Sequence, residues 1–192
     1  MTNDPFLDEF HITDEQRAIR DSVNSAVSAR RGPRVYQKGI DEKDKNKLRG
    51  HWEALIKQES RAYVRPPQRI TDKQHCAAID RIAKTLSHQC GSILHNRKLR
   101  FGTSQKAFNL YLKYLWRLGK IAEPPHCPLD DIVLRIGGLC GSWTTSDSQQ
   151  EYMDWIRWLR IRAKRQNLTL SVWEYDAWWS DYQKKKNSPL KP

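Results

Sequence analysis

Apolar residues recur at helical spacing in almost every segment of this 192-residue chain, and no other sequence feature restricts the fold as strongly. After Thr71, a typical N-cap residue, Ile79, Ile82, Ala83 and Leu86 fall on one face of a predicted helix. The sequence shows neither strand-like alternation of apolar and polar residues nor an internal repeat. Because about seven such segments are joined by short connections, we predict an all-α fold, a compact helical domain.

Proline, glycine and polar residues separate the predicted helices. Gly32-Pro33 ends the first helix, and Arg65-Pro66-Pro67 breaks the chain after the second. The predicted helices span residues 14–31, 42–63, 71–95, 104–118, 130–136, 147–166 and 170–183. They divide the chain into an N-terminal helical region (1–70), a helical core (71–183) and a basic flexible tail (184–192).

The chain carries a large positive charge. Lys and Arg total 34 against 22 Asp and Glu, which gives a formal net charge of +12. A charge of this size is typical of proteins that bind a polyanion, and DNA is the partner that we expect. The simpler alternative is a soluble basic protein that has no polyanionic partner.

The sequence contains no segment that predicts membrane insertion or export. It has no run of about 18 apolar residues, and its first thirty residues lack an apolar signal core. The four cysteines, Cys76, Cys90, Cys127 and Cys140, lie far apart and are expected to be reduced thiols. We therefore expect a cytoplasmic protein, nucleoid-associated if bacterial, with no membrane contact and no obligate protein partner.

Two stretches contain the residues best suited to chemistry, GTSQKAFNLYL (102–112) and PLDDIVLRI (128–136). Asp130 lies two residues after a proline at a predicted helix start, where backbone N–H groups hold a carboxylate ionised. Such a carboxylate stabilises the oxocarbenium-like state of glycosidic-bond cleavage. Lys106 opens an apolar helix, and a neutral lysine amine attacks a sugar carbon to form a Schiff base. Taken separately, a capping aspartate and a surface lysine explain both residues.

In order and content, these stretches resemble the helix–hairpin–helix DNA glycosylase superfamily, which includes the 8-oxoguanine glycosylase and endonuclease III branches. The family carries a hairpin G-h-G-x-K-x-A, where h is apolar, and further along the chain P-V-D-T-H-V-x-R. The matching positions are Gly102, Lys106, Asn109, Pro128, Asp130, Val133 and Arg135. Ser104 replaces the second hairpin glycine, and Asp131-Ile132 replaces the Thr-His pair.

The resemblance implies a glycosylase-like core with a helix–hairpin–helix element, which flips a modified base out of duplex DNA and cleaves its N-glycosidic bond. Asp130 would stabilise the sugar cation, and Lys106 would be the nucleophile, so that an AP-lyase step by β-elimination follows. If Lys106 has only a supporting role, water is the nucleophile. No metal or organic cofactor is implied. The residues expected to contact DNA are Arg97, Lys98, Arg100, Gly102, Thr103, Ser104, Gln105 and Arg135.

Base flipping also needs aromatic walls. Trp143, which follows a glycine-bearing loop, and Trp116 are the candidates for the base pocket. Five cations in RWLRIRAKR (157–165) either line a DNA backbone track or form a solvated face. No metal site is expected, because no C-x-x-C or paired-histidine spacing is present.

The sequence leaves the substrate and the class of function open. If the excised base is an oxidised purine, the enzyme would act in DNA repair. If it is a hypermodified phage base, the enzyme would act in antiviral defence. A non-catalytic DNA-binding module is one alternative to a glycosylase. A helical ribonuclease that uses Arg81 and His88 is the other, because their spacing occurs in one such family.

Overall fold

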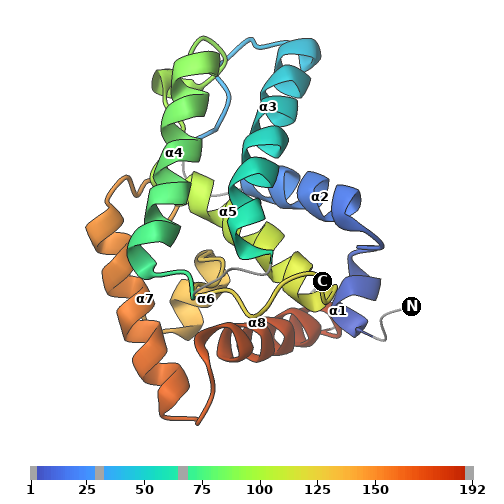
Figure 1. Cartoon of the computed structure of the whole chain (residues 1–192), viewed down its shortest axis with the longest axis vertical. Helices are drawn as coiled ribbons and strands as arrows, with labels where there is room; N and C mark the ends of the chain where they lie inside the picture. The colour runs from blue at the N-terminus through green and yellow to red at the C-terminus, as the bar shows by residue number, and fades with distance from the viewer. Residues whose placement is uncertain (1–3, 29–32, 65–68, 189–192) are drawn as a thin grey trace.

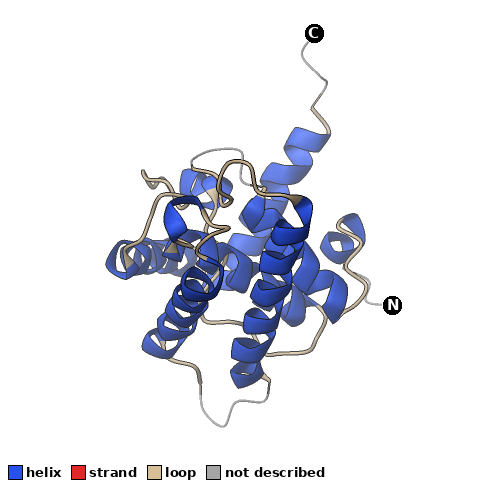
Figure 2. Cartoon of the chain, turned by 90° about the horizontal axis from the view of Figure 1, so that it is seen from above, coloured by secondary structure: helices blue, strands red, loops and turns tan. Residues whose placement is uncertain are grey.

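The structure is a computed structural model that describes residues 4–28, 33–64 and 69–188. Within these ranges the chain is all-α and forms eight α-helices and two short 3-10 helices (Figures 1 and 2). The elements are α1 (Pro5–Glu9), α2 (Glu15–Val27), α3 (Glu42–Ser60), η1 (Arg61–Tyr63), α4 (Asp72–Cys90), η2 (His95–Arg97), α5 (Phe101–Arg117), α6 (Asp131–Ile136), α7 (Gln149–Lys164) and α8 (Leu170–Lys186).

The all-α prediction is confirmed, and several predicted boundaries are corrected. Helix α1 was not predicted, and α5 begins at Phe101 rather than at residue 104. Helix α8 continues through Lys186, so the first three residues of the predicted tail are helical. The expected break at Arg65-Pro66-Pro67, the glycine at position 32 and the last four tail residues lie outside the described residues.

Most helices begin at a side chain that accepts hydrogen bonds from the first turn. Asp14 accepts from the N–H of Arg17, and Thr71 forms a reciprocal capping box with Gln74. Asp130 is the N-cap of α6, as the sequence predicted. These local signals explain why most predicted helix starts lie close to the observed ones.

Helix α5 crosses the middle of the molecule, with α2, α3 and α4 packed on it (Figure 1). Every residue from Phe101 to Leu115 is buried, whereas a surface helix buries only one stripe. Its buried polar residues therefore need partners on other elements. The residues concerned are Thr103, Ser104, Gln105, Lys106, Asn109 and Lys113.

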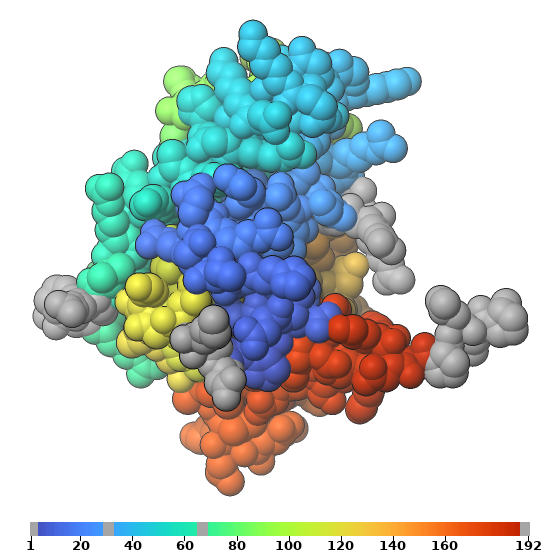
Figure 3. Space-filling model, turned by 90° about the vertical axis from the view of Figure 1, so that its right-hand side faces the viewer, coloured from blue at the N-terminus to red at the C-terminus, as the bar shows by residue number. Residues whose placement is uncertain are grey.

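One hydrophobic core extends from Phe6 to Trp173 and so joins the N-terminal region to the predicted core. The N-terminal residues also lie against α8 at the surface, as the blue and red atoms of Figure 3 show. There the Tyr182 hydroxyl donates to Glu9 at 2.9 Å, and Lys186 Nζ lies 2.6 Å from the same carboxylate. The two ends of the described chain thus close one side of α5.

Candidate active site

Lys106 and Asp130 are in direct contact. Lys106 lies in the second turn of α5, and Asp130 immediately precedes α6. Lys106 Nζ donates to Asp130 Oδ2 at 2.7 Å, and the two side chains are 10% and 14% exposed. The structure therefore brings together the two residues to which the sequence resemblance assigns the chemistry.

Asp130 accepts hydrogen bonds from three elements. Its Oδ1 caps α6 by accepting from the N–H groups of Ile132 and Val133, both at 3.0 Å. Its Oδ2 also accepts from Trp178 Nε1 of α8 at 3.2 Å. Burial acts to raise the pKa of Asp130, but the Lys106 ammonium and the backbone N–H of Val133 outweigh it and lower that pKa below its usual value. The carboxylate is thus held ionised.

A second buried ion pair lies next to the first. Lys113, two helical turns after Lys106, donates to Glu174 Oε1 of α8 at 2.9 Å. These side chains are 4% and 2% exposed. Burial raises the pKa of Glu174, although Lys113 opposes this effect.

Aromatic rings surround the Lys113 ammonium. Nζ lies 4.7 Å from the ring centre of Phe6, 5.3 Å from that of Trp178 and 5.5 Å from that of Tyr175. Cations are attracted to ring faces at such distances. Lys113 is therefore a desolvated cation that is held by one carboxylate and several rings.

A small cavity lies beside the two pairs and is lined by Lys106, Lys113 and Glu174. It measures about 50 Å³ and is lined by Phe6, Phe10, Ser25, Lys106, Leu110, Lys113, Tyr114, Pro128, Glu174 and Trp178. Typical ligand pockets measure roughly 300–1,000 Å³. The cavity is thus too small to hold an organic ligand unless its walls move apart.

The predicted base-pocket residues do not line this cavity. Trp143 is buried elsewhere, and its carbonyl packs against the backbone of Gly102. Trp116 lies near the end of α5, with the Arg117 guanidinium 5.2 Å from its ring. Trp178, which the sequence analysis did not select, is the tryptophan that contacts Asp130.

The expected DNA contacts divide into buried and exposed residues. Gly102, Thr103, Ser104 and Gln105 are buried in α5, so their side chains are not available to a phosphate. The start of α5 is also occupied, because Asp147 Oδ1 accepts from Phe101 N at 3.1 Å and the Ser146 carbonyl accepts from Gly102 N at 2.9 Å.

The basic residues of this set are more accessible. Arg97 and Lys98 are exposed, and Arg100 is partly buried. Lys98 pairs with Asp147 at 3.1 Å, and Arg135 pairs with Asp181 at 2.8 Å. Among the residues predicted to contact DNA, these cations are accessible at the surface, whereas residues 102–105 are buried.

Two arginines of α7, and Arg81 of the predicted ribonuclease pair, already form ion pairs within the protein. Arg157 pairs with Asp154, and Arg160 pairs with Asp72, each at 2.7 Å. Arg81 donates two hydrogen bonds to Glu59 at 3.0 and 2.6 Å. Among the residues that the structure describes, no hydrogen bond or ion pair joins Arg81 to His88.

Sequence reasoning missed Lys113, Glu174 and Trp178. A second lysine seven positions after Lys106, on the same apolar helix, was the available signal for Lys113. Glu174 and Trp178 are four residues apart in a tryptophan-rich helix and therefore share a face. No pattern in the sequence around these two residues indicated that this face of the helix packs against Asp130.

No protein-family model, curated protein or solved structure matches the chain. Among residues 4–28, 33–64 and 69–188, no three or more His, Cys, Asp or Glu side chains are grouped so as to hold a metal ion. In the same ranges, none of the helices combines the length and apolar content required to cross a membrane.

Proposed function

We propose that this protein is a DNA glycosylase that excises a modified base, with Lys106 and Asp130 as its catalytic residues. The observation that carries the proposal is the 2.7 Å contact between these two side chains. The pair is desolvated and lies at a helix start, where a carboxylate remains ionised. The formal net charge of +12 supports a DNA partner.

Asp130 supplies electrostatic stabilisation. As the bond between the base and C1′ lengthens, positive charge develops on the sugar, and a fixed carboxylate beside it lowers the barrier. The N–H groups of Ile132 and Val133 orient the carboxylate before the substrate binds. This orientation in the free protein supports the role that we propose for Asp130.

Lys106 supplies the nucleophile. Once the Lys106 ammonium has lost a proton to solvent, the neutral amine attacks C1′ while the base leaves with the bonding electrons. Asp130 stays ionised until the N–C1′ bond forms, and then passes one proton from that nitrogen to the departing base. Opening of the C1′–O4′ bond, with a proton from water going to O4′, gives a protonated Schiff base. Removal of a C2′ proton then expels the 3′-phosphate by β-elimination, and water hydrolyses the Schiff base and restores the lysine.

Substrate entry requires the aromatic side chains around the cavity to separate. A volume of about 50 Å³ does not accommodate a purine together with its sugar. Phe6 of α1, Phe10 just after α1 and Trp178 of α8 line the cavity, so displacement of α1 or α8 admits the base between aromatic walls. The target is an oxidised purine or a hypermodified phage base.

The test is base release from a panel of duplexes and phage DNAs that contain ordinary, oxidised and hypermodified bases. Products are resolved with and without hot alkali for wild type, Lys106→Ala and Asp130→Asn. Asparagine retains the capping function, so Asp130→Asn is expected to fold. The matched controls are Lys84→Ala and Asp80→Asn, which change an exposed lysine–aspartate pair on α4.

We expect alkali-labile sites in wild type and in both controls, and none in Asp130→Asn. Strand cleavage without alkali, and a borohydride-trapped protein–DNA adduct, should disappear in Lys106→Ala. Alkali-dependent cleavage alone would assign the attack to water, with Lys106 in support. Absence of base release on every substrate would refute the proposal and favour the DNA-binding module.

A further inference from the structure

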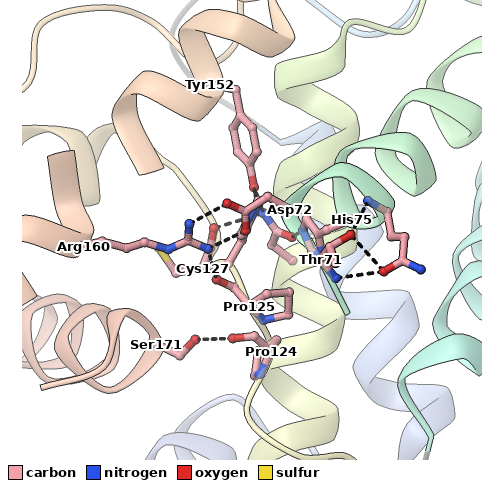
Figure 4. Close-up of polar contacts among 12 residues, drawn as sticks. Thr71, Asp72, His75, Pro124, Pro125, Cys127, Tyr152, Arg160 and Ser171 are labelled. Carbon is pink, nitrogen blue, oxygen red and sulfur yellow. Dashed lines mark hydrogen bonds and ion pairs between the residues drawn. The ribbon is translucent and has the colours of Figure 1, made fainter. Parts of the chain in front are cut away.

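Side chains from other elements donate hydrogen bonds to several carbonyls of the backbone that leads to Asp130. The Pro124 carbonyl accepts from Ser171 Oγ at 3.0 Å, and the Pro125 carbonyl accepts from Arg160 Nη2 at 3.0 Å (Figure 4). The Cys127 carbonyl accepts from Asn109 Nδ2 at 3.0 Å. We call residues 124–130 the aspartate loop.

Gln105 makes the contact nearest to the catalytic pair. Its Nε2 donates to the Leu129 carbonyl at 2.8 Å, and its Oε1 accepts from Leu129 N at 3.2 Å. Gln105 precedes Lys106 in the chain, and Leu129 precedes Asp130. This two-way amide contact therefore sets the distance between the backbones that carry the two catalytic side chains.

Asn109 joins this contact to a buried polar network. Its Nδ2 also approaches Gln105 Oε1 and the Tyr152 hydroxyl, both at 3.0 Å. His126 of the aspartate loop contacts the same Tyr152 hydroxyl at 2.8 Å. Because buried polar groups are costly when unpaired, each member restrains its neighbours.

The outer end of the network is an ion pair. Arg160 holds Asp72 with two hydrogen bonds at 2.7 Å, and Asp72 in turn lies 3.0 Å from His126 Nε2 (Figure 4 shows the Arg160–Asp72 contact). Hydrogen bonds from Arg160 and His126 hold the pKa of Asp72 well below its usual range. Helices α4, α5, α7 and α8 thus all restrain one loop.

We propose that Gln105 is the principal positioning residue of the active site, and that it fixes the aspartate loop so that the Asp130 carboxylate meets Lys106. The inference rests on the proposed function for its catalytic meaning. The geometric part of the proposal is that the Gln105 amide fixes the position of Asp130. This part concerns the free protein and can be measured without any substrate.

The variant Gln105→Met keeps the length of the side chain and removes both hydrogen bonds to Leu129. If the methionine variant does not fold, Gln105→Asn withdraws the amide by one methylene and still leaves a polar group in place. Ser104→Ala is the matched control. Ser104 is equally buried in the same turn, but its hydroxyl donates to the Ile79 carbonyl of α4 rather than to the aspartate loop.

The first measurement is an NMR titration of the Asp130 side-chain carboxyl in the free full-length chain, assigned with Asp130→Asn. Lys106 and Lys113 of α5 and Glu174 of α8 are the charged groups that act on it. When the carboxylate moves away from Lys106, burial dominates and its pKa rises above the wild-type value. We expect this rise in the Gln105 variant, and none in Ser104→Ala.

The second measurement is base release. Displacement of a catalytic group by about 1 Å lowers rates by up to roughly 100-fold, so kcat in the Gln105 variant should fall roughly 10- to 100-fold with KM unchanged. An unchanged Asp130 pKa in a folded Gln105 variant overturns the proposal. If the wild type releases no base, the proposed function fails, and the NMR titration alone still decides whether Gln105 places Asp130.

Discussion

The buried pair between Lys113 and Glu174 gives a sharp prediction about stability. Lys113→Met removes the ammonium and leaves a carboxylate that is 2% exposed. Methionine is the suitable replacement, because its thioether packs well among the rings of Phe6, Tyr175 and Trp178. The substitution therefore tests the unpaired charge and not a cavity.

The magnitude follows from the burial of the pair. Removing one partner of a buried ion pair lowers the free energy of unfolding by about 3–5 kcal/mol, because the remaining charge has no partner. The loss should be smaller in acid, since the Glu174 pKa is already raised by burial and rises further without Lys113. Once protonated, Glu174 is an unsatisfied neutral group, which costs about 1–3 kcal/mol.

Urea unfolding followed by far-UV circular dichroism at pH 7.5 and pH 5 measures both losses. The double variant Lys113→Met with Glu174→Leu replaces the pair with apolar groups and should unfold within about 1 kcal/mol of wild type, or be more stable. A single-variant loss below about 1 kcal/mol, an equal loss at both pH values, or simple additivity in the double variant would refute the reasoning.

Three further predictions concern other parts of the site. Gly102→Ala should lower the free energy of unfolding by about 1–3 kcal/mol in urea, because its Cβ would lie 1.8 Å from the Trp143 carbonyl; unchanged stability would contradict this packing. Burial lowers the pKa of His126, so stability should be lost as pH falls below 6.5, where the unfolded chain gains a proton that the folded chain excludes. The difference between urea unfolding at pH 7.5 and 5.5 should shrink in His126→Gln. Trp178→Phe removes the indole donor to Asp130 and should slow base release several-fold in single-turnover assays, with DNA affinity unchanged in a binding assay.

The local sequence predicted those features that depend on a few neighbouring residues. Asp130 was expected to cap a short helix, and it accepts from the N–H groups of Ile132 and Val133. The N-cap at Thr71 is a comparable case. Such contacts connect residues two or three positions apart, so the order of residue types is sufficient to predict them.

The start of α5 shows what the local sequence did not contain. Phe101 and Gly102 are helical although no side chain of α5 caps them, because Asp147 and Ser146 accept their N–H groups from another loop. Thr103 and Ser104, in the turn that follows, are likewise buried by distant parts of the chain, as the contact between Ser104 and Ile79 of α4 shows. The side chains that were expected to contact DNA are therefore not at the surface. A pattern read within ten residues does not reveal a cap that comes from more than forty residues away.

The two buried ion pairs beside the small cavity are more easily explained by function than by stability. Lys106 and Lys113 of α5 pair with Asp130 at the start of α6 and with Glu174 of α8. Replacing a buried ion pair such as Lys113–Glu174 with apolar residues of similar volume is often neutral or stabilising, because burying ions costs solvation that their attraction barely recovers. Ionisable groups with perturbed environments collect at sites of chemistry. Their concentration beside α5, with Trp178 hydrogen-bonded to the capping carboxylate, is therefore the reason that we propose this region as the active site.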